Sequence, residues 1–278
     1  MEQNILIRPT RSWSFPNWRE LWEYRDLLWL LVRRDFIAKY KQTILGPLWF
    51  ILQPLLMTLM FTVVFGNVAK IPTDGQPPLL FYLCGLLGWT YFSQCAGSIS
   101  GTFTANAHIF GKVYFPRLVL PLSVLISNLF AFVIQAATFL VFYAYYRMQG
   151  MASAWDESLF LLPLLLLQSA ALALGFGLCV SSLTTRYRDL MHALGLLMQL
   201  WMYATPVIYP LSQIPQRWRW VALFNPMVPV VEGFKRILLG AGTVEPQGVV
   251  VSLALTLLIL AGGFLLFRHV ERDFIDTV

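Results

Sequence analysis

The residues that come closest to a catalytic motif lie at positions 106–113. A Walker A loop begins with glycine and ends in Gly-Lys followed by serine or threonine. Its backbone N–H groups cradle phosphates, and its hydroxyl binds Mg²⁺. Gly111 and Lys112 fit this pattern, but Asn106 replaces the first glycine and Val113 replaces the hydroxyl residue. We therefore predict that this chain does not hydrolyse ATP by this route and is not an enzyme.

Metal-binding and nucleophilic motifs are also absent from the sequence. It contains no HExxH or GxSxG motif and no cluster of histidine, cysteine and carboxylate residues. Cys84, Cys95 and Cys179 lie in apolar stretches without CxxC spacing, so we interpret them as small buried hydrophobic residues. His192 lies inside an apolar stretch, and we interpret it as a structural hydrogen-bonding group rather than a proton relay. We expect no metal and no cofactor in this chain.

Aromatic rings and amides are the remaining side chains that could do chemistry inside the apolar stretches. Aromatic faces pack against the C–H faces of sugar rings, and amides and phenols form hydrogen bonds with hydroxyl groups. A channel lined in this way binds a polyhydroxylated chain weakly enough to release it. The simpler interpretation is that each ring packs against lipid or a neighbouring helix. The candidate channel residues are Trp49, Phe50, Gln53, Phe61, Trp89, Gln199, Trp201, Tyr203 and Tyr209.

The elements that must position these side chains are long and apolar. The 278 residues are 58% hydrophobic and 12% charged, whereas soluble domains carry roughly 25% charged residues. A helix of roughly 20 apolar residues crosses a bilayer core of about 30 Å. The sequence therefore predicts an all-α integral membrane protein with six transmembrane helices. The six stretches without Asp, Glu, Lys or Arg are 44–66, 79–107, 118–146, 158–185, 190–209 and 248–267.

Two other segments are too short or too charged to span. Residues 19–41 mix charges with a rough apolar stripe, which favours an amphipathic helix at the membrane interface. An ordinary solvated helix is the alternative. Within residues 210–247, the twelve residues 220–231 are uncharged but are interrupted by Pro226 and Pro229. This run is too short to span, which indicates a re-entrant or interfacial helical hairpin before the last span.

The distribution of Lys and Arg predicts the orientation. With the N-terminus inside, fourteen of the twenty Lys and Arg residues lie on the inner side and six on the outer side. Basic residues favour the cytoplasmic side, so we expect a multi-pass protein of the cytoplasmic (inner) membrane with both termini in the cytoplasm. The predicted parts are a cytoplasmic N-terminal segment (1–43), a transmembrane domain (44–268) and a cytoplasmic tail (269–278). We do not expect nucleic-acid binding, because the positive charge follows this membrane pattern.

The six stretches contain no carboxylate, which argues against an ion-coupled carrier, because such carriers usually place ionisable groups at mid-membrane. A membrane-embedded glycosyl- or acyltransferase would need a polar catalytic cluster near the interface, and the sequence shows none.

Four motifs resemble a known family. They are KYKQTILGPLWFILQPLL (39–56), FGKVYFPRLVLPLS (110–123), TTRYRDL (184–190) and NPMVPVVEGFKRILLG (225–240). Together they resemble the permease subunit of ABC-2 type exporters for polysaccharides and polyol phosphates, the family of the O-antigen, capsule and teichoic-acid exporters. The resemblance covers nearly the whole chain.

This resemblance implies a function and several partners. It implies the channel-forming subunit of an ATP-driven exporter that moves a lipid-linked polysaccharide, with an O-antigen-type chain as first choice. Capsule, teichoic acid, or a lipid or drug is the alternative cargo. It also implies a homodimer with two copies of a separate ATPase subunit, which binds the ATP and Mg²⁺.

The family motifs also assign roles to residues. The loop at residues 106–117 resembles the segment that docks on the ATPase. The alternative is an ordinary cytoplasmic loop whose basic residues only set the membrane orientation. Glu232 and Arg236 stand four apart in the outer hairpin, where they could pair with each other or shape an exit gate. The coupling residues implied are His108, Lys112, Tyr114, Phe115, Pro116, Arg117, Arg186, Arg188 and Asp189, and the outer-gate residues are Trp218, Trp220, Glu232 and Arg236.

Overall fold

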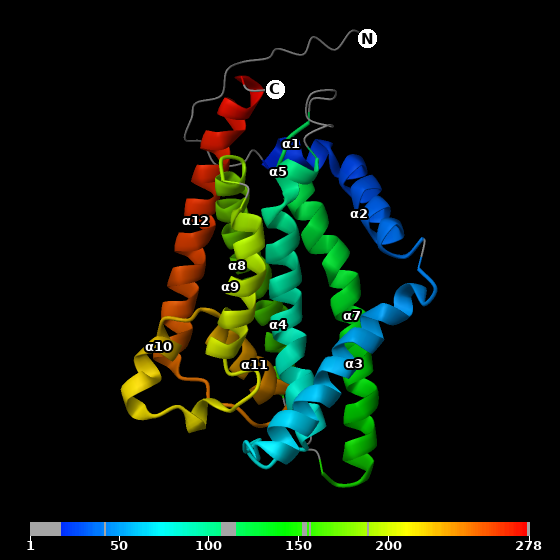
Figure 1. The fold of residues 1–278 in the computed structure, drawn as a ribbon, viewed down its shortest axis with the longest axis vertical. Helices are drawn as coiled ribbons and strands as arrows, with labels where there is room; N and C mark the ends of the chain where they lie inside the picture. Colours follow the sequence, from blue (N-terminus) through cyan, green and yellow to red (C-terminus); the bar gives the residue numbers. More distant parts are fainter. Residues whose placement is uncertain are drawn as a thin grey trace.

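The computed structural model describes residues 18–41, 43–106, 115–151, 155, 157–187 and 189–276. Every regular element in this part of the chain is a helix, and the helices form an elongated bundle (Figure 1). Five of them are long and apolar enough to cross a membrane: Gly46–Val68, Pro78–Ser100, Val119–Met148, Glu157–Thr184 and Pro246–Val270. The prediction of an all-α integral membrane protein is confirmed.

The predicted span at 190–209 forms a helix that is shorter than expected. Helix α9 (Leu190–Ala204) has 15 residues, a length of about 22 Å. It ends before Pro206 because proline disfavours helical backbone at the residue that precedes it, and Thr205 is extended (φ −103°, ψ 141°). The apolar run therefore continues to Tyr209 without continuing the helix.

Helix α4 (Pro78–Ser100) lies at the centre of the bundle, and 16 of its 23 residues are buried. It packs against α7 (Val119–Met148), α8 (Leu162–Thr184) and α11 (Met227–Leu239). The side chains that fill this core are mainly aromatic and branched, including Phe81, Phe92, Phe139 and Phe234. Most of the buried apolar area of the chain thus surrounds α4.

Small residues bring α8 and α12 (Pro246–Asp276) into close contact. A Cβ atom added to Gly175 would overlap the backbone of Leu260, and one added to Gly263 would overlap the backbone of Gly175. Close approach through small residues is a common way to pack helices in membranes. The last helix is therefore fixed against the core by backbone contact.

The first helices lie at the same end of the bundle as the end of α12. Helix α1 (Trp18–Glu23) leads into α2 (Arg25–Tyr40), which packs against α7 through Leu31 and Val32 (Figure 1). Trp29 and Leu30 of α2 are exposed, so its apolar residues do not form one sharp stripe. A short helix α5 (Thr102–Ala105) lies at the same end. The interfacial position of α2 in a membrane stays a prediction.

The first span, residues 46–68, is built differently from the others. A 3-10 turn (Gly46–Leu48), helix α3 (Trp49–Phe61) and a π-helix (Thr62–Val68) follow one another. This segment crosses the front of the bundle obliquely (Figure 1), and most of its side chains are exposed.

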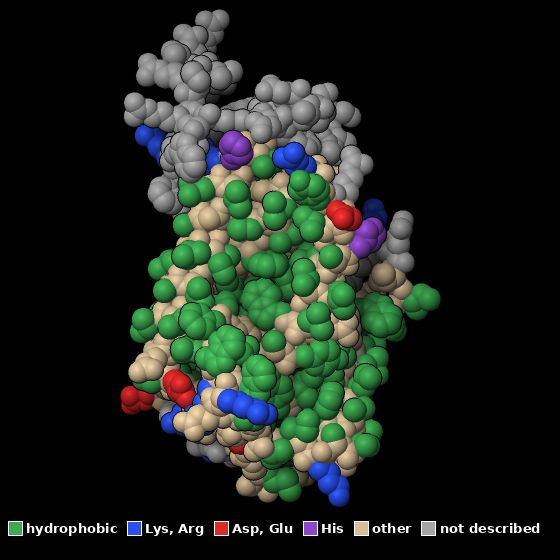
Figure 2. All heavy atoms as spheres, turned by 60° about the vertical axis from the view of Figure 1, so that its left-hand side comes forward, with side chains coloured by type: hydrophobic (Ala, Val, Ile, Leu, Met, Phe, Trp, Pro, Cys, Tyr) green, Lys and Arg blue, Asp and Glu red, His purple; other side chains and the backbone are tan. Residues whose placement is uncertain are grey.

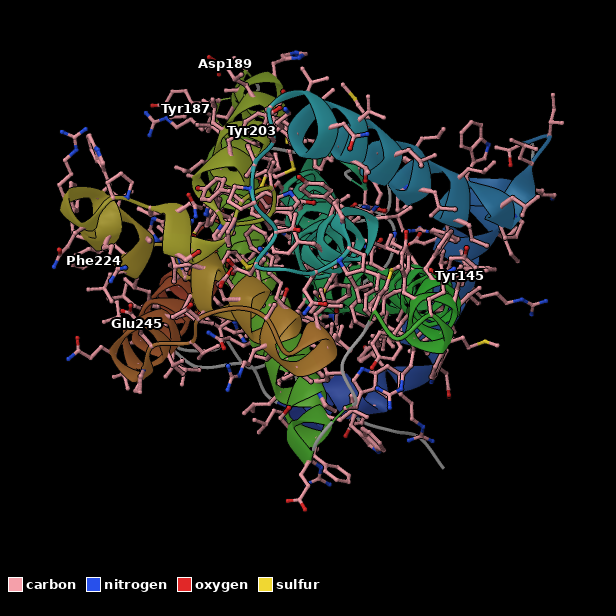
Figure 3. The ribbon with its side chains drawn as sticks, turned by 90° about the horizontal axis from the view of Figure 1, so that it is seen from below. Tyr145, Tyr187, Asp189, Tyr203, Phe224 and Glu245 are labelled. Atoms are coloured by element: carbon pink, nitrogen blue, oxygen red, sulfur yellow. The ribbon has the colours of Figure 1, made fainter. Side chains whose placement is uncertain are left out.

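The predicted outer hairpin is present as a set of short helices. The turns Leu211–Gln213 and Gln216–Trp218 precede α10 (Arg219–Leu223) and α11. Seen from below, α10 and Phe224 lie at the edge of the molecule, whereas α11 crosses toward its middle (Figure 3). Twelve of the 13 residues of α11 are buried, and Gly240 ends the helix in a left-handed conformation (φ 68°).

The surface of the bundle has the pattern of a protein that faces lipid. In Figure 2, hydrophobic side chains cover the middle of the visible face, and charged side chains gather toward its two ends. Exposed leucines, such as Leu196, Leu200 and Leu257, contribute to this apolar surface. An apolar surface of this extent needs a membrane or a partner to cover it.

Candidate functional site

A groove of about 790 Å³ lies between α3, α4, α7 and α9. Its lining residues are Trp49, Phe50, Gln53, Pro54, Leu56, Met57 and Met60 of α3, Leu86, Trp89, Thr90, Ser93, Gln94 and Ser98 of α4, Asn128 and Gln135 of α7, and Met202 of α9. On α4, the lining residues Leu86 and Trp89 are followed by the polar residues Thr90, Ser93, Gln94 and Ser98. The groove combines ring faces with hydrogen-bonding groups, as a surface for polyhydroxylated ligands requires.

The polar groups of the groove are neutral. None of the lining residues that the structure describes is Asp, Glu, Lys, Arg or His. The side chain of Asn128 donates to the Val124 carbonyl at 3.0 Å, whereas Gln53, Gln94 and Gln135 form no side-chain hydrogen bond with any described residue. Gln135 is only 6% exposed. Its amide lines the groove, where a ligand can form hydrogen bonds with it.

A second hollow of about 340 Å³ adjoins this groove. Ser98 and Asn128 line both, and the second hollow extends to Asp35 and Ala38 of α2. Asp35 accepts two hydrogen bonds from the Arg34 guanidinium, at 2.8 and 3.0 Å. The two hollows together extend from α2, at the end of the bundle that holds the N-terminal helices, toward the opposite end.

Four of the nine predicted channel residues line the groove: Trp49, Phe50, Gln53 and Trp89. Phe61 instead packs in the core, with its ring centroid 6.1 Å from that of Tyr82. Trp201 packs against Phe92 and Phe176, behind the groove. These two rings support the wall of the groove rather than facing it.

The other three predicted channel residues lie on or after α9. Gln199 and Tyr203 are exposed on this helix, and the Tyr209 hydroxyl donates to the Tyr203 carbonyl at 2.9 Å. In Figure 3, Tyr203 lies on α9, which begins near Tyr187 and Asp189. In a single copy of the chain these three residues do not line the groove. Their contact with a glycan stays a prediction.

Sequence reasoning overlooked the polar residues on α4 and α7. Asn128 and Gln135 stand seven residues apart, which is two turns of helix, and therefore lie on one face. Thr90, Gln94 and Ser98 follow at intervals of four on α4. This helical spacing of neutral polar residues within apolar stretches is the signal that could have identified them.

A buried ion pair holds α11 in place. Lys235 Nζ lies 3.2 Å from Glu232 Oε1, and both side chains are almost fully buried. The same ammonium donates to the carbonyls of Pro206 and Tyr209 and lies 3.9 Å from the ring centroid of Phe81. The Thr243 N–H donates to Glu232 Oε2 at 2.8 Å. Each charge therefore has several partners, which a buried ion pair needs.

This pair differs from the one between Glu232 and Arg236 that the sequence suggested. Glu232 pairs with Lys235, three residues along the helix, and Arg236 is exposed. Successive residues of an α-helix are about 100° apart, so Lys235 faces the core while Arg236 faces away. The expected pair of Glu232 and Arg236 was therefore wrong, although their spacing of four residues allowed it.

Asn225 fastens the other end of α11. Its amide nitrogen donates to the Ala204 carbonyl at 3.2 Å and to Thr205 Oγ1 at 2.9 Å. Its Oδ1 accepts from Trp201 Nε1 at 2.9 Å and from the Met227 N–H at 3.1 Å. Asn225 and Lys235 thus join the end of α9 to both ends of the buried helix.

The predicted outer-gate residues do not form one surface. Trp218 and Trp220 are exposed on the hairpin, near the headgroup region that the sequence predicts. Arg236 is exposed as well, but Glu232 is buried. A gating role for these residues stays a prediction.

The predicted coupling residues lie in part outside the described residues. His108, Lys112, Tyr114 and Arg188 belong to this undescribed part. Phe115 packs in a cluster with Leu31, and Arg117 is buried beside the start of α7. Arg186 and Asp189 are exposed in the turn between α8 and α9.

Comparison with known proteins identifies the family. The family model for the ABC-2 type transporter matches residues 26–239. The O-antigen export system permease protein RfbA of Myxococcus xanthus is 32% identical over 263 residues, which cover 94% of this chain and 98% of that protein. The chain belongs to the ABC-2 type transporter family, and the resemblance inferred from its motifs is confirmed.

Other relatives also match this chain over most of its length. The O-antigen export system permease protein RfbA of Klebsiella pneumoniae is 26% identical, with 91% of this chain and 95% of that protein covered. The polysialic acid transport protein KpsM of Escherichia coli is 26% identical, with 89% and 94% covered. The similarity therefore extends over almost the full length of these permeases.

Proposed function

We propose that this chain is the permease subunit of an ATP-driven exporter and that it moves a lipid-linked polysaccharide of the O-antigen type. The observation that carries the proposal is the neutral groove lined by amides and aromatic rings. Membership of the ABC-2 family and similarity to proteins named as O-antigen export permeases support it.

The proposed complex contains two copies of this chain and two copies of an ATPase subunit, which holds the ATP and Mg²⁺. The sequence has no Walker A loop, so the work of transport must come from a partner. The groove is lined by α3, α4, α7 and α9 of one copy, and a second copy packed beside α9 would enclose it. The exposed leucines of α9 provide apolar area for this contact.

The proposed orientation places both termini on the cytoplasmic side of the inner membrane. The helices nearest the two termini lie at the same end of the bundle, and Lys and Arg are concentrated in the segments at that side. The loop around Phe115 to Arg117 and the turn with Arg186 and Asp189 would contact the ATPase at this end. The second hollow, beside α2, would then be the cytoplasmic entrance.

Deleting the gene and restoring it in the native host tests this proposal. We expect the deletion to remove the polysaccharide from the cell surface and to leave its lipid-linked form inside the cell. Restoring the chain returns it to the surface, whereas restoring the chain in a strain without the ATPase subunit does not. Unchanged surface polysaccharide in the deletion strain would contradict the proposed function.

A further inference from the structure

The three unpaired glutamines of the groove define its ligand more narrowly than the family does. Gln53, Gln94 and Gln135 come from three different helices, α3, α4 and α7, and all line the same groove. None of their side chains forms a hydrogen bond with a described residue, so all three amides are available to a ligand in the groove. An amide offers both a donor and an acceptor, so it matches a sugar hydroxyl in either role.

The absence of charge from this lining argues against an anionic ligand. Pores that conduct anions or phosphate line their path with Arg or Lys, because an unpaired charge in an apolar site loses its hydration without compensation. Among the described residues that line the groove there is no cation, and Asp35, which lines the adjoining hollow, is paired with Arg34. A row of carboxylates along the groove would meet no compensating charge on the described lining residues.

We propose that the groove takes a stretch of glycan without charged groups, whose hydroxyls bond to the amides of Gln53, Gln94 and Gln135. This inference rests on the proposed export function and adds the chemical class of the cargo. The rings of Trp49 and Trp89 border the same space and offer faces for the C–H sides of the sugars. Acidic polymers with a carboxylate on each repeating unit are excluded from the groove. The reason is the loss of hydration of their carboxylates, and not the size of the polymer.

Two polymers on the same lipid carrier test this proposal. Inside-out vesicles contain the chain and its ATPase partner, and receive either a neutral hexose polymer or a hexuronic acid polymer of equal length. Protection from an added glycosidase measures ATP-dependent uptake. We expect the neutral polymer to be taken up at least about tenfold faster, the effect of one uncompensated charge-assisted contact. Equal uptake rates would overturn the inference and leave the export function intact.

Lysine variants provide the matched comparison. Replacing Gln53→Lys and Gln94→Lys together places cations in the groove, and we expect this to narrow the preference for the neutral polymer by about tenfold. Gln149→Lys, exposed at the end of α7 and outside the groove, is the control and leaves the preference unchanged. Gln53→Lys alone serves if the double variant does not fold, because Gln53 is exposed.

The remaining outcomes are equally decisive. An unchanged ratio of uptake rates in a folded lysine variant would overturn the role of the glutamines. Failure of wild-type vesicles to take up either polymer with ATP would contradict the export function itself, and the inference would fall with it.

Discussion

Helices α3 and α11 have the same length but opposite environments. Each has 13 residues, of which three are buried in α3 and 12 in α11. Helix α11 is fastened by the ion pair of Glu232 and Lys235 and by the hydrogen bonds of Asn225. Helix α3 lies at the outside of the bundle, contains Pro54 and continues into a π-helix.

This difference separates a fixed part of the molecule from an adaptable one. The groove has a well-packed wall, formed by α4, and an exposed wall, formed by α3. Pro54 cannot donate a backbone hydrogen bond, and π-helical segments are frequent at functional sites. We therefore expect α3 to move when the groove opens, while α11 and the end of α9 move together as one unit.

The largest expected effect comes from breaking the buried ion pair. Lys235→Met leaves the Glu232 carboxylate buried without its partner, which we expect to lower the free energy of unfolding by about 3–5 kcal/mol. Arg236→Met, on the exposed face of the same helix, should change it by less than about 0.5 kcal/mol. Denaturant unfolding of the purified variants measures both. Equal effects would show that α11 is not fastened by this pair.

A smaller loss of unfolding free energy is expected at Asn225, which holds the start of α11. Asn225→Ala removes the partners of Trp201 Nε1, the Ala204 carbonyl and the Met227 N–H. We expect a loss of about 2 kcal/mol of unfolding free energy, because buried groups are left without hydrogen bonds. Asn67→Ala, exposed in the π-helix, is the control and should have little effect. A comparable loss at both positions would remove the distinction between the two regions.

The smallest effect on stability is expected in α3, where we predict an effect on transport. Pro54→Ala restores a backbone donor and straightens the helix, so we expect unfolding free energy to change by less than about 1 kcal/mol while the export rate changes severalfold. Pro163→Ala is the control. Pro163 lies in the first turn of α8, where backbone N–H groups have no acceptor within the helix, so a proline there removes no hydrogen bond. Unchanged export in Pro54→Ala would contradict the proposed mobility of α3.

The sequence predicted the long helices well, because apolar length determines them. The stretch 118–146 became α7, and short helices lie on either side of Pro226, where the sequence predicts a hairpin. The depth of that hairpin was not predictable from composition. Glu232 was placed in the outer hairpin by the family motif and Lys235 by the count of basic residues, and only the fold shows that their charges compensate each other in the core.

The candidate site was predictable only in part, for a related reason. Residue type indicates that Trp49 and Trp201 could bind a sugar, but not which way each ring faces. Trp201 is turned into the core by its hydrogen bond to Asn225, 24 residues away. Gln135 was overlooked although it stands two helical turns after Asn128, because this spacing does not show which helices their shared face of α7 meets.

Photochemical cross-linking tests the central claim most directly, namely that the groove is the path of the glycan. A photoreactive side chain at position 94, in the groove, is compared with one at Leu257, an exposed apolar position of α12. During ATP-driven export we predict that position 94 captures the polysaccharide and position 257 does not. Capture at neither position, or equally at both, while export proceeds would contradict this account.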